Sequence, residues 1–167
     1  MPDTAYPATY PASEPMSLRP PFYADTAARK ARMAEDAWNT RDPGRVSLAF
    51  TEDSAWRNRS ESFSGRPATV LFLREKWAFE LECRLIKEVR ASAGDRIAAR
   101  FAYEWHDADG AWFRSHGNER WEFAANGLTR RREASIDDVP VATADRPFLW
   151  PPGPRPVDQG GLSDLGL

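Results

Sequence analysis

Ionisable side chains alternate with aromatic rings along residues 100–123, which read RFAYEWHDADGAWFRSHGNERWEF. Arg100, Glu104 and Glu119 are the members of this stretch that suit chemistry on a small molecule. A glutamate in an apolar site can exchange a proton near neutral pH, and an arginine can hold a carbonyl or carboxylate oxygen with two parallel hydrogen bonds. The stretch predicts the wall of a polar pocket on a sheet whose two faces have different surroundings.

Strands joined by tight turns are expected to account for the second half of the chain. We place them at residues 82–91, 96–106, 111–123 and 128–139, with Gly, Asn or Asp in each connection. Before them, residues 23–40 and a segment that begins at Pro67 carry apolar side chains at helical spacing. Helices followed by an antiparallel meander predict an α+β domain over residues 23–139, with N-terminal helices packed on a strongly curved sheet.

Hairpin geometry predicts which side chains share a face of this sheet. A last turn at residues 124–127 pairs Glu119 with Arg132. A preceding loop of two or four residues then places Arg100 and Glu104 on the same face. We expect this face to lie against the helices, so that Arg100, Glu119 and Arg132 meet inside a hollow cone.

Two interpretations of this charged cluster remain open. Charges inside an apolar cone must be paired, so Arg100, Glu119 and Arg132 can form a structural ladder that satisfies itself. Alternatively, one arginine keeps spare donors for a ligand, and Glu119 or Glu104 carries a proton. The two glutamates lie on the order of 13 Å apart along the strands, which excludes a carboxylate pair of the glycosidase kind. Glu104 can equally be an ordinary sheet residue near the rim.

Trp56, Asn58 and Trp121 are the further candidates for contact with a ligand. Trp56 and Asn58 share one side of an extended segment at residues 54–64, and the amide of Asn58 offers both a donor and an acceptor. Trp121 has the flat ring that stacks on a planar molecule, or on an arginine across the hairpin. Packing in the core or at the rim explains all three equally well.

The opposite face of the same strands carries a set of large aromatic side chains. Such a face is too apolar to be left in water, which favours a homodimer contact. Its members are Phe101, Tyr103, Trp105 and Trp112.

Composition limits the class of the protein. The net charge of −2 and pI of about 5.8 give no electrostatic case for nucleic acid, and the apolar runs are too short to cross a membrane. The single cysteine, Cys83, suits a reducing compartment, so we expect a cytoplasmic protein. Its two histidines fall on opposite faces, and the sequence contains no phosphate loop or dinucleotide motif, so no metal or cofactor is expected.

Both ends of the chain are rich in proline. Residues 1–22 lack a cationic start and an apolar block, which predicts a flexible leader rather than a secretory signal. Residues 140–167 are rich in Pro and Gly and predict a tail packed on the surface, where Phe148, Leu149 and Trp150 can hold it.

The order of these elements, with Gly65-Arg66-Pro67 before a helix and NGLTRRREASIDD closing the sheet, resembles the nuclear-transport-factor-2-like (NTF2-like, SnoaL-like) superfamily. Three longer segments are similar to the uncharacterised family called domain of unknown function 1348: DSAWRNRSESFSGRPATVLFLREKW, the stretch quoted first, and DLGL at the end. The resemblance implies a cone-shaped fold, an internal cavity and a homodimer.

The superfamily includes ketosteroid isomerase, scytalone dehydratase, limonene epoxide hydrolase and polyketide cyclases, as well as proteins that only bind. No catalytic residue of these enzymes has a counterpart that can be placed here, and fold alone does not settle function. The resemblance implies a cavity but no reaction. We predict a small-molecule-binding protein and, if it is an enzyme, a cofactor-independent isomerase, cyclase or dehydratase/hydrolase of a carbonyl-containing substrate. The alternative is a non-catalytic ligand-binding or protein-interaction domain that uses the outer face of the sheet.

Overall fold

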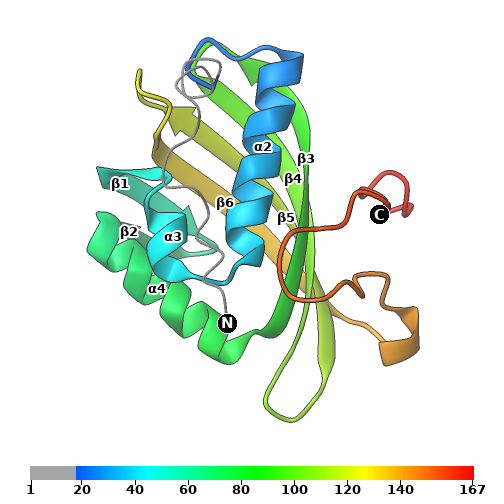
Figure 1. The fold of residues 1–167 in the computed structure, drawn as a ribbon. Helices are drawn as coiled ribbons and strands as arrows, with labels where there is room; N and C mark the ends of the chain where they lie inside the picture. Colours follow the sequence, from blue (N-terminus) through cyan, green and yellow to red (C-terminus); the bar gives the residue numbers. More distant parts are fainter. Residues whose placement is uncertain (1–17) are drawn as a thin grey trace, which may run out of the picture.

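A computed structural model describes residues 18–167, so most of the expected leader, residues 1–17, lies outside the described part. The strands within 18–167 form one six-stranded sheet in the order β2-β1-β6-β5-β4-β3. Helices α2, α3 and α4 cover one face of it (Figure 1). In chain order the elements are α2 (Ala24–Asn39), α3 (Pro43–Ser47), β1 (Phe50–Asn58), β2 (Glu61–Ser64), α4 (Arg66–Phe79), β3 (Leu81–Ala93), β4 (Arg96–His106), β5 (Trp112–Phe123), β6 (Thr129–Pro140) and the short 3₁₀ turn η1 (Thr143–Asp145).

The prediction of an α+β fold with helices on a curved sheet is confirmed. Neighbouring strands run antiparallel except for β1 and β6, which are parallel, so the sheet is mixed. Residue pairing along the sheet shifts at bulges near Cys83 and Arg90 of β3 and between Glu122 and Phe123 of β5. Bulges increase the local twist of a strand and help it to bend around the helices.

Helix α2 is fixed to the edge strand β3 by hydrogen bonds as well as by packing. Ala27, Ala31 and Trp38 are its buried apolar side chains. The amide of Asn39 donates to the carbonyl oxygen of Leu85 and accepts from its N–H, both at 2.9 Å. Glu35, also fully buried, accepts a hydrogen bond from the backbone N–H of Lys87 at 2.8 Å. These bonds determine where Lys87 lies relative to the helix.

The pairing of β5 with β6 differs from the expectation by two residues. Trp121 lies opposite Arg132, and Glu119 lies opposite Ala134. A shift of two residues keeps the side chains on the same face, because side chains alternate with a period of two. Glu119 and Arg132 therefore face the helices together, as predicted.

The predicted face of β4 is wrong. Trp105 pairs with Phe113, and the connection between the two strands, residues 107–111, holds five residues rather than two or four. With an odd number of loop residues, every side chain of β4 faces the side of the sheet opposite to the one predicted with an even number. The carboxylate of Asp107 stabilises this longer loop by accepting from the N–H groups of Asp109 and Ala111 at 3.0 and 2.9 Å.

The aromatic residues of β4 consequently lie in the core rather than on an outer face. Phe101, Tyr103 and Trp105 are at most 5% exposed and pack beneath the helices. Trp112 does face outward, but the guanidinium of Arg146 covers its ring at 3.1 Å from the centroid. The predicted homodimer contact through Phe101, Tyr103, Trp105 and Trp112 is therefore wrong.

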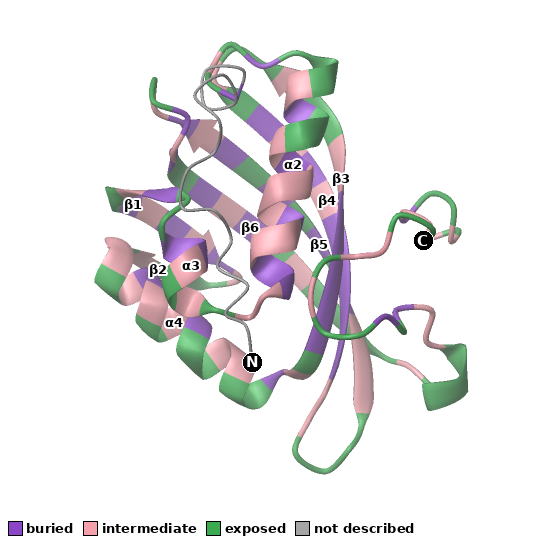
Figure 2. Ribbon diagram, in the orientation of Figure 1, coloured by how far each residue is buried: buried purple, intermediate pink, exposed green. Residues whose placement is uncertain are grey.

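The C-terminal segment covers part of the outer face of the sheet (Figure 2). Phe148, Trp150 and Leu162 form a small buried cluster with Ile86 of β3 and Ala102 of β4. Arg155 extends the attachment to α2, where its Nε donates to Glu35 at 3.0 Å. The outer surface of β3 and β4 is thus occupied by the chain itself.

Candidate ligand-binding cavity

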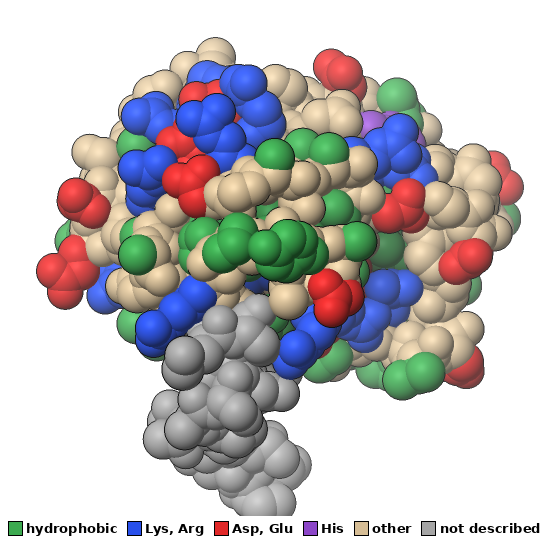
Figure 3. Space-filling view, turned by 90° about the horizontal axis from the view of Figure 1, so that it is seen from above, with side chains coloured by type: hydrophobic (Ala, Val, Ile, Leu, Met, Phe, Trp, Pro, Cys, Tyr) green, Lys and Arg blue, Asp and Glu red, His purple; other side chains and the backbone are tan. Residues whose placement is uncertain are grey.

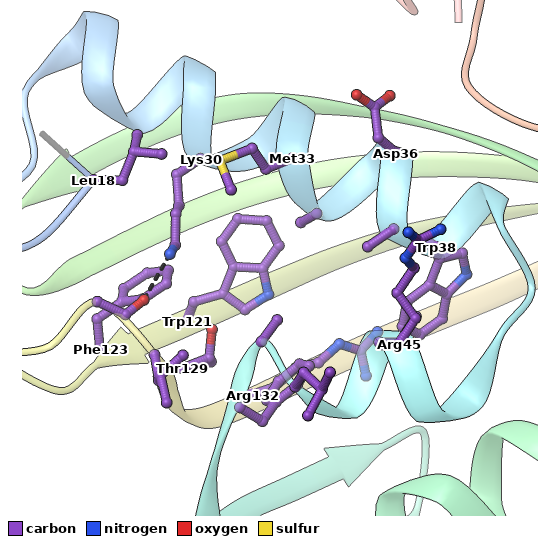
Figure 4. Close-up of a pocket in the computed structure, with 18 of the residues that line it drawn as sticks. Leu18, Lys30, Met33, Asp36, Trp38, Arg45, Trp121, Phe123, Thr129 and Arg132 are labelled. Carbon is purple, nitrogen blue, oxygen red and sulfur yellow. Dashed lines mark hydrogen bonds between the residues drawn. The ribbon is translucent and has the colours of Figure 1, made fainter. Parts of the chain in front are cut away.

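A cavity of about 570 Å³ lies between α2, the segment that carries α3, and the ends of β5 and β6 (Figure 4). Its size is within the range of about 300–1,000 Å³ that is usual for sites of small organic ligands. Most of the wall is apolar, and the charged side chains are concentrated at a few places. The residues that line the cavity include Leu18, Lys30, Met33, Ala34, Trp38, Lys87, Glu119, Trp121, Phe123 and Arg132.

Three charged side chains from three strands meet at one end of this cavity. Glu119 of β5 accepts from Arg132 Nε through one carboxylate oxygen at 2.9 Å and binds Lys87 Nζ through the other. All three side chains are at most 2% exposed. Lys87 lies opposite Phe101 of β4 and Glu119 lies opposite Ala99, so their contact crosses β4 diagonally.

Aromatic rings enclose the two cations of this group. Lys87 Nζ lies 4.6 Å from the ring centre of Phe101, and Trp38 and Trp121 are at 5.4 and 5.3 Å. The guanidinium of Arg132 lies 4.6 Å from the ring of Trp56. The negative faces of aromatic rings stabilise cations that have been removed from water.

The protonation of this group follows from its charges. Burial alone raises the pKa of Glu119, but the nearby Lys87 and Arg132 outweigh burial and hold this pKa below its usual value. Burial and the repulsion of Arg132 lower the pKa of Lys87, against the attraction of Glu119. With Glu119 ionised and Lys87 protonated, two cations and one anion give the group a net positive charge at the end of an apolar cavity. Such a charge favours an anion or a carbonyl oxygen.

Arg132 has a donor to spare. Its Nε binds Glu119 and its Nη1 donates to Asn58 Oδ1 at 3.0 Å, which leaves Nη2 without a hydrogen-bond partner among residues 18–167. Asn58 and Trp56, both predicted as ligand contacts, are therefore arranged around Arg132, where they hold its side chain. Trp121, the third such prediction, lies on the cavity wall.

The other predicted site residues of β4 lie on the outer face. Arg100 donates to Glu88 at 3.1 Å and to the backbone oxygen of Leu167 at 2.6 Å. Glu104 is fully buried there and accepts from Arg114 at 2.9 Å and from the N–H of Phe148 at 3.1 Å. The predicted grouping of Arg100 with Glu119 and Arg132 is wrong, and so is the placing of Glu104 on the cavity side. Both side chains hold the C-terminal segment instead.

Lys87 takes the place that was assigned to Arg100. It was missed although the sequence contains the signal that locates it. Leu85 and Val89 are apolar residues on either side of Lys87 at a spacing of two, so strand alternation places all three on one face.

Lys30 is the second cavity residue that was missed. It lies on α2 with Ala34 and Ala37 at helical spacing, and all three line the cavity. Its Nζ donates to the carbonyl oxygen of Gly127 at 2.6 Å, shown as a dashed line in Figure 4, and lies 5.3 Å from the ring centre of Phe123. Burial lowers the pKa of Lys30 to about 8.

Several other charged residues of β5 and β6 face outward. Arg130 and Arg131 surround Glu122 at 3.6 and 3.7 Å, and Arg120 pairs with Glu133. In the view from above, basic and acidic side chains lie beside one another over this end of the molecule (Figure 3). Among residues 18–167, no three His, Cys, Asp or Glu side chains are grouped as metal ligands, and no helix is long and apolar enough to cross a membrane.

Known proteins resemble the chain in sequence and in fold. The model of the family described as "Protein of unknown function (DUF1348)" matches residues 20–149. A search of curated proteins finds no match. Among solved structures, an NTF2-like protein of unknown function from Exiguobacterium sp. 255-15 is 19% identical, with a TM-score of 0.56 over 68% of this chain and 99% of the other.

Two further solved structures are of enzymes or suspected enzymes. SalBIII, an epoxide hydrolase/cyclase-like enzyme with a role in pyran ring formation in the polyether salinomycin, is 13% identical, with a TM-score of 0.60 over 72% of this chain and 94% of that one. A putative polyketide cyclase from Xanthomonas campestris pv. campestris is 20% identical, with a TM-score of 0.57 over 66% and 93% of the two chains. At these identities the likeness shows the NTF2-like fold alone.

Proposed function

The chain belongs to the DUF1348 family and has the NTF2-like fold, and from this premise we propose that it binds a small, mostly apolar molecule in the cavity between α2 and the sheet. The ligand carries a carbonyl or carboxylate oxygen, which lies at the end formed by Lys87, Glu119 and Arg132. The observation that carries this proposal is the buried guanidinium of Arg132 in an apolar cavity of about 570 Å³, with its Nη2 unoccupied by residues 18–167.

The same arrangement supports a reaction class. A cation close to a carbonyl oxygen stabilises the negative charge that develops there when a neighbouring proton is removed or water is added. Isomerisation, cyclisation or dehydration of a carbonyl compound through an enolate passes through such a charge. SalBIII, an epoxide hydrolase/cyclase-like enzyme, and the putative polyketide cyclase share the fold.

Glu119 is better suited to hold the cations than to carry the proton. Both of its oxygens are engaged, and its pKa is held below the usual value by Lys87 and Arg132. A general base works best with a pKa near the working pH. Lys30, which also lines the cavity, has a pKa in that range, at about 8.

Binding is testable with 2-naphthoate, a flat apolar molecule that carries one carboxylate. We expect saturable binding of one molecule per chain by isothermal titration calorimetry. The Arg132→Gln substitution should weaken it by roughly tenfold or more, because about 1.4 kcal/mol, a modest charge-assisted hydrogen bond, is a factor of ten. 2-Ethylnaphthalene, which lacks the carboxylate, should bind more weakly than 2-naphthoate.

A matched pair of variants on α2 tests the place of binding. Ala34 lines the cavity and Ala28 is exposed on the same helix. Ala34→Trp fills the cavity and should abolish 2-naphthoate binding, whereas Ala28→Trp should leave it unchanged. Equal affinity in the two variants would mean that the molecule binds elsewhere, and the proposal would fail.

A further inference from the structure

The distribution of lysine in this chain is unusual. Of its 23 lysine and arginine residues, only Lys30, Lys76 and Lys87 are lysines. None of the three lies on an exposed surface, whereas arginines such as Arg96 and Arg120 are about 70–75% exposed. Exposed cations are thus arginines, and each lysine occupies a particular place in the interior. Lysine differs from arginine in that it can lose its proton and become a nucleophile.

The surroundings of the three lysines differ. Lys76 is paired with Glu80 and Lys87 with Glu119, so the amine of each donates to a carboxylate oxygen and lies against an acceptor rather than open to a ligand. Lys30 instead has a neutral partner, the carbonyl oxygen of Gly127, and forms no ion pair with a described residue. The ring of Phe123 lies beside its Nζ in Figure 4, and Met33 is a further apolar side chain of the cavity lining.

This geometry suits an unprotonated amine. A neutral amine that donates one N–H to the carbonyl oxygen of Gly127 still has an electron pair for attack on a group in the cavity that Lys30 lines. Burial without a carboxylate partner favours the neutral form, in agreement with the lowered pKa of Lys30, about 8. Desolvation in an apolar pocket is one of the ways in which proteins activate a lysine for attack on a carbonyl group.

We propose that Lys30 condenses with an aldehyde or ketone group of the ligand and forms an imine inside the cavity. The electron pair of Nζ attacks the carbonyl carbon to give a carbinolamine. Loss of the oxygen as water, with both protons coming from the amine by exchange through solvent, leaves a C=N bond in place of the C=O bond. The reaction needs no oxidant and no cofactor.

The inference rests on the proposed cavity function and makes its substrate class narrower. The ligand has a reactive carbonyl at the Lys30 end and a second oxygen that faces Lys87 and Arg132, because all three residues line the same cavity. An imine or iminium withdraws electrons from the adjacent carbon. It therefore eases removal of a proton there, which is the step that isomerisation and cyclisation of a carbonyl compound require.

The experiment uses 2-naphthaldehyde, which has the skeleton of 2-naphthoate with an aldehyde in place of the carboxylate. The full chain is incubated with it and with sodium cyanoborohydride at pH 8, and the reduced secondary amine is located by peptide mapping and mass spectrometry. At this pH about half of Lys30 is unprotonated, against roughly 0.4% of a lysine with the ordinary pKa of about 10.4. We expect one dominant adduct, at Lys30, formed at least about tenfold faster than any adduct at Lys76 or Lys87.

Controls separate attack within the cavity from general amine labelling. The Lys30→Arg variant has a guanidinium in place of the amine. A guanidinium does not form the imine, so the dominant adduct should disappear. Ala34→Trp retains Lys30 and fills the cavity, and should slow its labelling by about tenfold or more, while Ala28→Trp labels like the parent chain. If a variant does not fold, mapping of the parent chain with and without excess 2-naphthoate makes the same separation.

The outcomes distinguish this inference from the proposed function. If the parent chain binds 2-naphthoate and Lys30 is labelled no faster than the α-amino group, the cavity function stands and the imine proposal is overturned. If Lys30 is labelled rapidly but equally in Ala34→Trp, and 2-naphthoate does not bind, Lys30 is a reactive surface amine and both proposals fail. Rapid labelling that excess 2-naphthoate suppresses supports both.

Discussion

Two buried lysine–glutamate pairs lie under the helices of this protein, and only one of them lines the cavity. The first is Lys87 with Glu119, which joins β3 to β5. The second is Lys76 with Glu80, at the end of α4, where the hydroxyl of Tyr103 accepts from Lys76 and donates to Glu80, each at 3.1 Å. Both place one amine and one carboxylate in the core, but they differ in the third member of the group.

The third member decides the electrostatic character of each pair. Burial opposes the charge of Lys76, but Tyr103 and Glu80 outweigh it and raise the pKa of this lysine above its ordinary value. At the other pair Arg132 adds a second cation, and the pKa of Lys87 is lowered. The pair with a phenol is a closed polar contact of the core, whereas the pair with a guanidinium has positive charge left for a ligand. A lysine–glutamate pair therefore has a structural role at Lys76 and Glu80, whereas we propose a ligand-binding role for the pair of Lys87 and Glu119.

The largest expected effect is the loss of the glutamate that serves two cations. Glu119→Gln leaves Lys87 and Arg132 buried without a countercharge, and should lower the free energy of unfolding by about 3–5 kcal/mol. Glu80→Gln leaves one cation beside Tyr103, and should cost about 1–3 kcal/mol. Urea unfolding at pH 7 measures both. If the two substitutions lower the free energy of unfolding equally, the second cation, Arg132, does not account for the difference between the two pairs.

The effect of acid on Glu119 has a defined sign. Its folded-state pKa is lowered, so its contribution to stability is present above the unfolded pKa of about 4.3 and is lost as the pH falls through the folded value. The difference in unfolding free energy between the parent chain and Glu119→Gln should therefore shrink below pH 4. A difference that is constant from pH 7 to pH 3 would contradict an ionised Glu119.

A smaller effect is expected at Gly117, where β5 makes room for the ring of Phe101. A Cβ at this position would lie 2.1 Å from that ring, which also faces Lys87. Gly117→Ala should lower the free energy of unfolding by about 1–3 kcal/mol through overpacking. It should also weaken 2-naphthoate binding, because the displaced ring moves against the cavity group. Gly161→Ala, where the nearest atom is at 3.6 Å, is the matched control and should change neither quantity.

Lys30 should make stability rise with pH. Its folded-state pKa of about 8 lies below the ordinary value, so between pH 8 and about 10.4 the unfolded chain binds more protons than the folded one. The free energy of unfolding of the parent chain, relative to Lys30→Met, should increase over this interval by on the order of 1 kcal/mol, because Lys30 is half-buried. A flat difference would show that Lys30 is solvated like a surface lysine.

The smallest effect is expected at Cys83, beside the closed pair. Burial raises the pKa of this thiol to about 12, with Lys76 lowering it and Glu80 raising it in turn. Iodoacetamide at pH 8 should leave the folded protein unmodified at Cys83 under conditions in which 2-naphthaldehyde labels Lys30. Rapid alkylation of Cys83 would show that the region around Lys76 opens as readily as the cavity does.

Sequence reasoning located the fold and two of the three charged residues that meet in the cavity, Glu119 and Arg132 but not Lys87. Turn residues 124–127 were sufficient to place Glu119 and Arg132 on one face, because a register error of two residues does not change that face. The composition of the loop at 107–111 was not sufficient to place the side chains of β4. The odd length of this loop depends on two hydrogen bonds to Asp107, which composition does not reveal. That single error moved Arg100 and Glu104 inward and the aromatic residues of β4 outward. Lys30 was missed because α2 was assigned one buried stripe, whereas its neighbouring face lines the cavity.

The hydrogen bonds from Asn39 and Glu35 to β3 have a consequence for solubility. β3 is an outer strand of the sheet, and such strands present unpaired N–H and C=O groups that can recruit a strand of another chain. The two side chains of α2 occupy the free backbone groups of Leu85 and the N–H of Lys87 in the middle of that strand. Helix α2 thus protects the sheet against edge-to-edge aggregation as well as forming the roof of the cavity.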